Sequence, residues 1–340
     1  MSESKTTPKL GVTLSQNLTF QQKLVRASGE FSTILTQIAL AGKLIARALS
    51  HAGLFDRSGR ADHADAEDKQ KKLDVYANDA FVNTFSRSPW VATIVSESMR
   101  DPVHLHSRLQ GGKYIVCVDP LDASNLANNG VVGSIFSVLR RVETTDQATE
   151  RDLLQKGTEQ VAAGYIMYGP STMLVYTSGD GVNAYTLDAG IGEFVITHEN
   201  IRIPERGLTY ACNESLYHDW HEETRRFIEH LRKKDPKSEK HYSARYAGSL
   251  IADFHRILLF GGVYLYPSPA SSPITQGGKR RLLYECNPMA FVCEQAGGKA
   301  TNGEDRILKI QPTSLHQRSP LIIGSPYEVL LYDDFVAGKK

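Results

Sequence analysis

The stretch that most constrains the fold is residues 114–118, a run of apolar and β-branched side chains that leads into Asp119-Pro120. Such a run predicts a strand buried inside a sheet. Pro120 has no amide proton and cannot continue a central ladder, so we expect the strand to end at Asp119 and the chain to turn there. The sequence therefore predicts a carboxylate held at the end of a buried strand.

A second carboxylate, Asp122, follows three residues after Asp119, and Leu121 offers a backbone carbonyl between them. Hard oxygen ligands of this kind are those that Mg²⁺ prefers. The small residues Ala123 and Ser124 leave backbone amides free to meet a phosphate. For an Asp-x-x-Asp pair alone, a turn without a ligand is the simpler interpretation, so the prediction depends on the other acidic residues.

Carboxylates also follow two other apolar runs, at Glu97 and at Glu285. If these strand ends meet, their carboxylates repel one another unless cations enter the site. Divalent ions there would stabilise both the attacking and the leaving oxygen of an in-line displacement at phosphorus. The basic residues 279–281 precede Glu285 and suit an anionic substrate, so the pattern indicates a metal-dependent site for a phosphorylated ligand.

The length of 340 residues allows a large core, and we expect two subdomains with a boundary near residues 200–207. The formal net charge of +1 gives no electrostatic footprint for nucleic acid or an anionic membrane, and no apolar run is long enough to span a bilayer. Residues 1–11 lack the apolar core of a secretory signal, and we interpret them as a disordered leader. The four cysteines form no Cys-x-x-Cys pair, which indicates buried thiols in a reducing cytoplasm.

Helical periodicity is clearest over residues 29–52, where apolar side chains recur every three to four residues. Helices mixed with antiparallel strands predict a layered α+β architecture. The remaining helices are expected over 66–86, 218–233 and 246–256 and from Asn287 as N-cap, and the strands over 90–95, 135–142, 160–168, 172–176, 183–187, 257–266 and 282–284.

A series of motifs runs along most of the chain. They are Lys71-Lys-Leu-Asp74, Ser96-Glu97, Gly112-Lys-Tyr114, Asp119-Pro-Leu-Asp122, Ala162-Ala-Gly-Tyr165, Ile191-Gly-Glu-Phe194, Arg245-Tyr-Ala-Gly248, Leu283-Tyr-Glu-Cys-Asn-Pro-Met-Ala-Phe291, His316-Gln-Arg318 and Ile323-Gly-Ser-Pro326. Taken together, these motifs resemble the class 1 fructose-1,6-bisphosphatase family over roughly residues 12–335. They are long and occur in the family's order, which makes the resemblance specific.

The resemblance implies the layered αβαβα fold of sugar phosphatases, in the inositol-monophosphatase-like superfamily, and a homotetramer. It implies an N-terminal domain over residues 12–200 with the metal and allosteric sites, and a sugar-phosphate-binding domain over residues 201–335. The implied reaction is the hydrolysis of the 1-phosphate of fructose 1,6-bisphosphate to fructose 6-phosphate in gluconeogenesis. It depends on Mg²⁺, with Mn²⁺ or Zn²⁺ as alternatives, takes place in the cytoplasm, and is inhibited by AMP.

The resemblance also assigns residues to each role. The implied catalytic residues are Asp74, Glu97 and Ser98. The implied metal ligands are Asp68, Glu97, Asp119, the Leu121 carbonyl, Asp122 and Glu285. The implied substrate-binding residues are Ala123, Ser124, Asn213, Tyr246, Tyr266, Lys279 and Arg281, with Arg245 from a neighbouring subunit. The implied AMP-binding residues are Ser28, Gly29, Glu30, Ser32, Lys113, Tyr114 and Arg140.

The catalytic motifs depart from the family pattern at Ser98, where the family has a second glutamate, and at Ala123 and Ala127, where it has glycine and aspartate. Three interpretations stay open on this basis: an active fructose-1,6-bisphosphatase with either a full or a reduced rate, a phosphatase of another sugar bisphosphate, and a non-catalytic paralogue. The last would bind sugar phosphate or AMP and regulate, or assemble with, an active relative. Phosphate release with and without Mg²⁺, over a panel of substrates, separates the three.

Overall fold

The structure is a computed structural model of the chain. It describes residues 11–25, 29–52, 63–127, 130–234 and 241–340, and of residues 24, 25, 52 and 63–69 it describes only the main-chain path. Within these ranges, no helix is both long and apolar enough to cross a membrane. All four cysteines are buried and free, as the sequence predicts.

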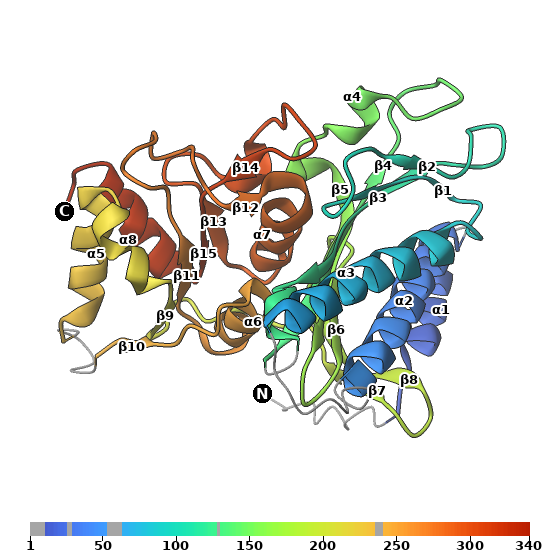
Figure 1. The fold of residues 1–340 in the computed structure, drawn as a ribbon, viewed down its shortest axis with the longest axis horizontal. Helices are drawn as coiled ribbons and strands as arrows, with labels where there is room; N and C mark the ends of the chain where they lie inside the picture. Colours follow the sequence, from blue (N-terminus) through green and yellow to red (C-terminus); the bar gives the residue numbers. More distant parts are fainter. Residues whose placement is uncertain (1–10, 26–28, 53–62, 128–129, 235–240) are drawn as a thin grey trace, which may run out of the picture.

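An eight-stranded sheet dominates the N-terminal half, in the order β2-β1-β3-β4-β5-β6-β7-β8 (Figure 1). Neighbours from β3 to β8 are antiparallel, whereas β1 and β3 are parallel. The strands are β1 Val91–Ser96, β2 Val103–His104, β3 Tyr114–Asp122, β4 Val132–Arg140, β5 Gln160–Tyr168, β6 Met173–Thr177, β7 Asn183–Asp188 and β8 Glu193–His198. The edge strands β2 and β8 were not predicted from the sequence.

Three helices, α1 Leu14–Val25, α2 Glu30–Ala52 and α3 His63–Phe85, cover one face of this sheet. Their apolar stripes form one core with the strands, in which Ile38 and Phe81 join Phe136 of β4. Burial of such a face, rather than helix propensity, supplies most of the stability of helices of this kind. The helix predicted over residues 29–52 is confirmed almost to the residue.

A smaller sheet in the C-terminal half has the strand order β10-β9-β11-β15-β13. The helices α5 Glu222–Arg232 and α8 Pro326–Val336 cover its outer face, where the Phe227 and Tyr332 rings lie 5.2 Å apart edge to face. The strands are β9 Thr209–Ala211, β10 Ser243–Ala244, β11 Val263–Tyr266, β13 Lys299–Thr301 and β15 Leu321–Gly324. The short elements α4 Glu150–Leu153, β12 Arg280–Arg281 and β14 Arg318–Ser319 lie outside both sheets.

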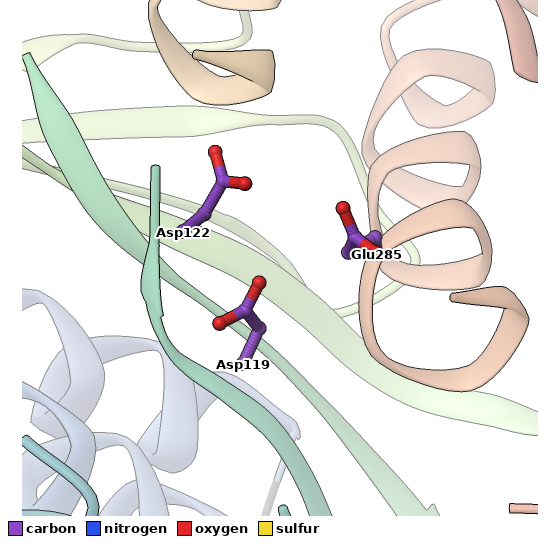
Figure 2. Close-up of side chains that lie close together, drawn as sticks. All are labelled: Asp119, Asp122 and Glu285. Carbon is purple, nitrogen blue, oxygen red and sulfur yellow. The ribbon is translucent and has the colours of Figure 1, made fainter. Parts of the chain in front are cut away.

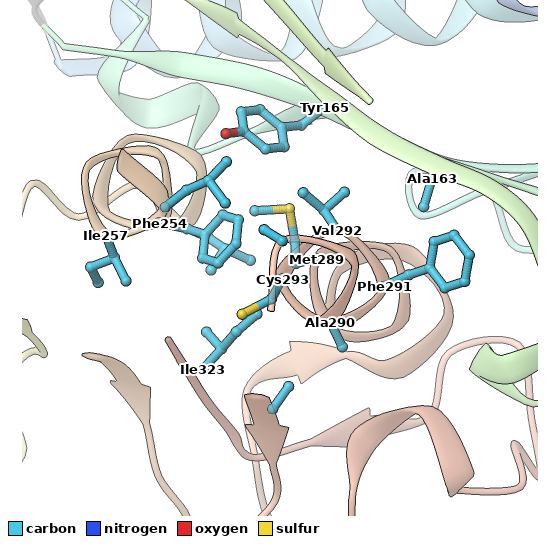
Figure 3. Packing of buried hydrophobic residues seen from close by; sticks show 14 of the residues in the cluster. Ala163, Tyr165, Phe254, Ile257, Met289, Ala290, Phe291, Val292, Cys293 and Ile323 are labelled. Atoms are coloured by element: carbon cyan, nitrogen blue, oxygen red, sulfur yellow. The ribbon is translucent and has the colours of Figure 1, made fainter. Parts of the chain in front are cut away.

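The helices α6 Leu250–Phe260 and α7 Asn287–Gln295 lie between the two sheets (Figure 3). One core cluster joins Met289 of α7 both to Tyr165 of the large sheet and to Ile323 of the small one. The layers therefore run helices, sheet, helices, sheet, helices. This arrangement is the αβαβα fold that the resemblance implied.

The structure corrects two predictions of local structure in the C-terminal half. Residues 257–260 belong to helix α6, which ends at Gly261 with φ of 78°, and not to a strand. Residues 282–284 belong to a π-helical turn, Leu282–Cys286, that runs directly into α7, so Asn287 is helical and is not the N-cap. Both segments are short apolar runs, and periodicity alone cannot separate strand from helix in such runs.

The prediction that β3 ends at Asp119 is also wrong, because the strand continues to Asp122. It pairs with β4 at Asp119↔Ile135 and again at Asp122↔Gly133, so β3 carries one more residue than its partner between these pairs. Pro120 falls in this bulge, where a missing amide proton breaks no ladder bond. The bulge re-aims the end of β3 without ending the strand.

A buried hydrogen-bond chain fixes the bulge. Ser134 Oγ donates to the Pro120 carbonyl at 2.7 Å, and its own oxygen lies 2.8 Å from the Tyr168 hydroxyl. Both bonds are buried, and a buried carbonyl left without a donor costs free energy. Ser134 on β4 therefore holds the main chain between the two aspartates.

We expect Ser134→Ala to lower the free energy of unfolding by roughly 1–3 kcal/mol, because it leaves the Pro120 carbonyl buried and unpaired. Tyr168→Phe is the matched control, since Ser134 keeps its bond to Pro120 in that variant, and we expect a smaller loss. Urea unfolding followed by circular dichroism measures both. Equal losses in the two variants would contradict this role for Ser134.

Candidate active site

Three carboxylates meet where the end of β3 faces the π-helical turn before α7 (Figure 2). Asp119, Asp122 and Glu285 are all buried, and each offers an oxygen within 4.8 Å of the others. Figure 2 shows the two aspartates on the β3 ribbon and Glu285 on the helical one, with the carboxyl groups turned toward a common space. The predicted meeting of Asp119, Asp122 and Glu285 is present in the structure.

Burial makes this acidic cluster electrostatically costly. Removal from water raises the pKa of Asp119 well above its ordinary value, and the carboxylates of Asp122, Glu285 and Glu97 raise it further. The Arg280 guanidinium acts in the opposite direction. A cation that enters the cluster would relieve the repulsion between the carboxylates.

The donors of the acidic cluster fit a hard divalent cation. Among the residues that the structure describes, none donates a hydrogen bond to Asp122 Oδ2, although that oxygen is buried. Buried polar atoms in proteins nearly always have a partner, so this unpaired oxygen is available to a bound ion. Together with Asp119, it offers the oxygen ligands that Mg²⁺ prefers.

Glu97 follows directly after β1 and lies beside the acidic cluster. Its amide donates to the Val118 carbonyl at 2.9 Å, which places it next to the end of β3. Its carboxylate accepts from Arg281 Nε at 3.2 Å and is about a third exposed. Glu97 is therefore the more accessible of the neighbouring acids.

Asp74, on α3, joins the same region. Removal from water raises the pKa of Asp74, a hydrogen bond with the Ser124 side chain lowers it, and the charge of Glu97 raises it again. Ser124 also accepts from Gln70 Nε2 at 2.9 Å, a contact that the sequence did not indicate. The structure thus brings Asp74, Ser124 and Glu97 together beside the middle of α3.

For the other residues implied for catalysis and metal binding, the structure shows fewer contacts. Ser98 is exposed, and its backbone amide donates to Ser96 Oγ. Leu121 is buried on β3 between the two aspartates. The side chain of Asp68 lies outside the described residues.

Ala123 follows Asp122 in a left-handed conformation, with φ of 58° and ψ of 35°. It begins the short 3-10 helix Ser124–Leu126. This conformation costs roughly 1–2 kcal/mol for a residue with a Cβ, and glycine adopts it freely. The position where the family has glycine is therefore one where the backbone favours glycine.

Three of the residues implied for sugar-phosphate binding, Tyr246, Tyr266 and Lys279, lie close to one another. Lys279 Nζ lies 5.9 Å from the centre of the Tyr266 ring. Burial raises the pKa of Tyr246, and the Tyr266 hydroxyl raises it further, so the two phenols are close. Asn213 caps the 3-10 helix Glu214–Asp219, and Arg245 Nη1 donates to the Ala244 carbonyl.

A separate cavity of about 830 Å³ lies at the other end of β3, by the start of α2. Its lining includes four of the residues implied for AMP, Gly29, Ser32, Tyr114 and Arg140. The Arg140 guanidinium lies 5.7 Å from the centre of the Tyr114 ring. An arginine at a helix N-terminus provides the donors and positive charge that a phosphate needs.

The two other AMP-binding candidates in the described ranges, Glu30 and Lys113, form an ion pair with each other. Lys113 Nζ donates to Glu30 Oε1 at 2.5 Å, beside the cavity. Ser28 lies outside the described residues.

Arg280 is a residue of the acidic cluster for which the sequence predicted no individual role. Its Nη1 donates to Glu285 Oε1 at 2.7 Å and to Asp122 Oδ1 at 3.1 Å, while Arg281 on the same short strand contacts Glu97. Successive side chains of a strand point to opposite faces, so the two arginines reach different acids. The alternation of side chains along a strand could have indicated this difference between the two arginines. However, β12 has only two residues, so no alternation can be recognised in the sequence.

Comparison with known proteins identifies the family of this chain. The model of the fructose-1-6-bisphosphatase N-terminal domain matches residues 12–199, and that of the C-terminal domain matches residues 203–336. A class 1 fructose-1,6-bisphosphatase of Acaryochloris marina is 48% identical over 326 residues, covering 95% of this chain and 97% of that one. One from Chloroherpeton thalassium is 47% identical over 315 residues, covering 92% and 89%.

Solved structures give the same result. Leishmania major fructose-1,6-bisphosphatase in holo form superposes with a TM-score of 0.86 at 38% identity, over 95% of this chain and 98% of that chain. The apo form gives 0.83 at 37% identity, with the same coverage. The sequence and the fold are therefore those of a phosphoric monoester hydrolase. The chain belongs to the fructose-1,6-bisphosphatase family.

We expect Ala123→Gly to raise the free energy of unfolding by roughly 0.5–1 kcal/mol, because glycine adopts the left-handed conformation without a steric penalty. Ala127→Gly is the matched control. Ala127 is right-handed, with φ of −56°, and glycine there should destabilise the protein. Urea unfolding of both variants measures the difference, and a loss of stability in Ala123→Gly would contradict the prediction.

Proposed function

We propose that this protein hydrolyses the 1-phosphate of fructose 1,6-bisphosphate to give fructose 6-phosphate and phosphate. The near-complete alignment with class 1 fructose-1,6-bisphosphatases carries this proposal. The acidic cluster with arginines beside it supports the same chemistry, because it can hold a cation and a phosphate side by side.

We propose Mg²⁺ as the cation, held by Asp119 and Asp122, with Glu97, Glu285 and the Leu121 carbonyl within the same region. When bound, such an ion supplies Lewis-acid stabilisation of the negative charge on the phosphoryl oxygens. The protein's own part is to fix the carboxylates on a rigid strand and a helical turn, which limits the motion of the ligands. Mn²⁺ and Zn²⁺ are alternatives that the same oxygen donors accept.

Asp74 is our candidate for the general base that accepts the proton of the attacking water. Burial and the neighbouring Glu97 charge raise its pKa, which brings the carboxylate closer to a useful basicity at neutral pH. Ser98, an exposed hydroxyl, is no base near neutral pH, so Asp74 acts without the second carboxylate that the family has there.

The substrate binds across the two halves of the chain in this proposal. Arg281, next to Glu97, faces the 1-phosphate, with the Ala123 and Ser124 amides on the opposite side. Lys279, Tyr246 and Tyr266 hold the 6-phosphate, since their ammonium and hydroxyl groups donate to phosphate oxygens. Asn213 and an Arg245 from a neighbouring subunit of a homotetramer complete this second site.

We also propose that AMP binds in the 830 Å³ cavity at the start of α2 and inhibits the reaction. Arg140 and the amides of the first turn of α2 would receive the phosphate. Lys113 lies beside the cavity and is paired with Glu30, so binding of the phosphate by Lys113 requires a change of partner.

The function is tested with Asp119→Asn. We expect phosphate release from fructose 1,6-bisphosphate at saturating Mg²⁺ to fall by at least about 10²-fold, because a charged oxygen ligand is lost. We also expect the metal-free variant to be more stable than the wild type, because one of three mutually repelling buried charges is removed.

The two readouts separate a functional role for Asp119 from a structural one. Loss of activity together with a lower melting temperature would show only that the fold is damaged. Wild-type protein that releases no phosphate while it still binds the sugar phosphate would overturn the proposed hydrolysis, and would favour the non-catalytic paralogue.

AMP binding is tested with Arg140→Ala. We expect at least about tenfold weaker AMP binding in calorimetry, because a charge-assisted hydrogen bond to phosphate contributes about 1.5–3 kcal/mol. Arg151→Ala is the control, since Arg151 is 82% exposed and pairs with Glu143 instead. Equal affinity in Arg140→Ala and the control would count against this cavity.

A further inference from the structure

Arg280 is held in the acidic cluster on several sides at once. Its Nη1 bridges Glu285 Oε1 and Asp122 Oδ1 at 2.7 and 3.1 Å. Its Nε and Nη2 donate to the hydroxyl of the fully buried Tyr264 at 3.2 and 2.9 Å. The guanidinium also lies 5.2 Å from the centre of the Tyr266 ring. These contacts fix the position of the Arg280 guanidinium.

The charge of Arg280 is permanent, because arginine does not lose its proton in proteins. Its side chain is 13% exposed, and those of Asp122 and Glu285 are 5% and 8% exposed. Removing one partner of a buried pair would leave an uncompensated charge. The guanidinium is therefore a fixed part of the acidic cluster.

The oxygens that Arg280 takes are not available to a metal in the same arrangement. Glu285 Oε2 accepts from the Arg281 amide at 2.6 Å, so both oxygens of Glu285 have partners. An ion that bridged Asp122 Oδ1 and Glu285 Oε1 at about 2.0–2.1 Å from each would lie against the guanidinium. Repulsion between the two cations excludes such a position.

We propose that the Arg280 guanidinium is a resident cation of the acidic cluster. It fills the position between Asp122 and Glu285 and leaves Asp119 and the second oxygen of Asp122 as the place where a divalent ion binds. Formal charge agrees, since three carboxylates and one guanidinium leave −2, which one divalent ion balances. The inference rests on the proposed metal-dependent function and sets the number of ions that the cluster takes.

The test counts bound Mn²⁺ by equilibrium dialysis, with free Mn²⁺ read by electron paramagnetic resonance. We expect Arg280→Met to bind one more Mn²⁺ per chain than the wild type, or to bind Mn²⁺ at least about tenfold more tightly, because a unit charge beside the ion is gone. Lys279→Met is the matched control. It removes the same charge from an exposed neighbour that lies over Tyr266, and it should bind Mn²⁺ as the wild type does.

Two further variants keep the result interpretable if Arg280→Met is unstable. Tyr264→Phe removes the hydroxyl that holds the guanidinium but changes no charge in the cluster, and we expect tighter Mn²⁺ binding from it as well. Arg280→Lys keeps the charge, and we expect the wild-type count.

Equal stoichiometry and affinity in the wild type, Arg280→Met and Tyr264→Phe would overturn the inference while leaving the metal site intact. The same change in Mn²⁺ binding in Lys279→Met as in Arg280→Met would also overturn it. The loss of any nearby positive charge, and not the position of Arg280, would then explain the change. A complete absence of Mn²⁺ binding in every form would overturn the proposed metal-dependent function, and this inference with it.

Discussion

The repulsion among three buried carboxylates is the constraint that the packing of the two halves has to overcome. Asp119 and Asp122 come from the large sheet, whereas Glu285 and Arg280 come from the C-terminal half. Like charges in a medium of low dielectric do not assemble by themselves, and each needs a cation within a few ångströms. Apolar packing of α6 and α7 between the sheets holds the chain in place while Arg280 neutralises part of the charge.

The sequence predicted those parts of the fold and the site in which one local signal dominates. The long helix over residues 29–52 has a clear period, and the carboxylates after apolar runs indicated a shared acidic site. Local signals were insufficient where an apolar segment is short and shows no clear period, as at residues 257–260 and 282–286. The bulge at Pro120 was missed because a proline that breaks a ladder and one that sits in a bulge look alike in sequence.

The contacts of Arg280 could not be predicted for a different reason. It meets Asp122 across 158 residues of sequence, and another of its acceptors, Tyr264, lies on another strand. Which of two adjacent arginines faces the acidic cluster depends on the pleat of a two-residue strand, and a strand of two residues has no visible alternation. Pairings of this kind follow from the tertiary fold and not from the chain's local pattern.

The two arginines also show how burial separates fixed charge from exchangeable charge. Arg281 pairs with Glu97, which is 32% exposed, so water can replace either partner when a phosphate or a metal arrives. Arg280 pairs with carboxylates that are 5% and 8% exposed, and water cannot replace it at comparable cost. Neighbours in sequence with the same side chain are therefore suited to opposite tasks. Arg281 is suited to a ligand that comes and goes, and Arg280 to the standing charge of the acidic cluster.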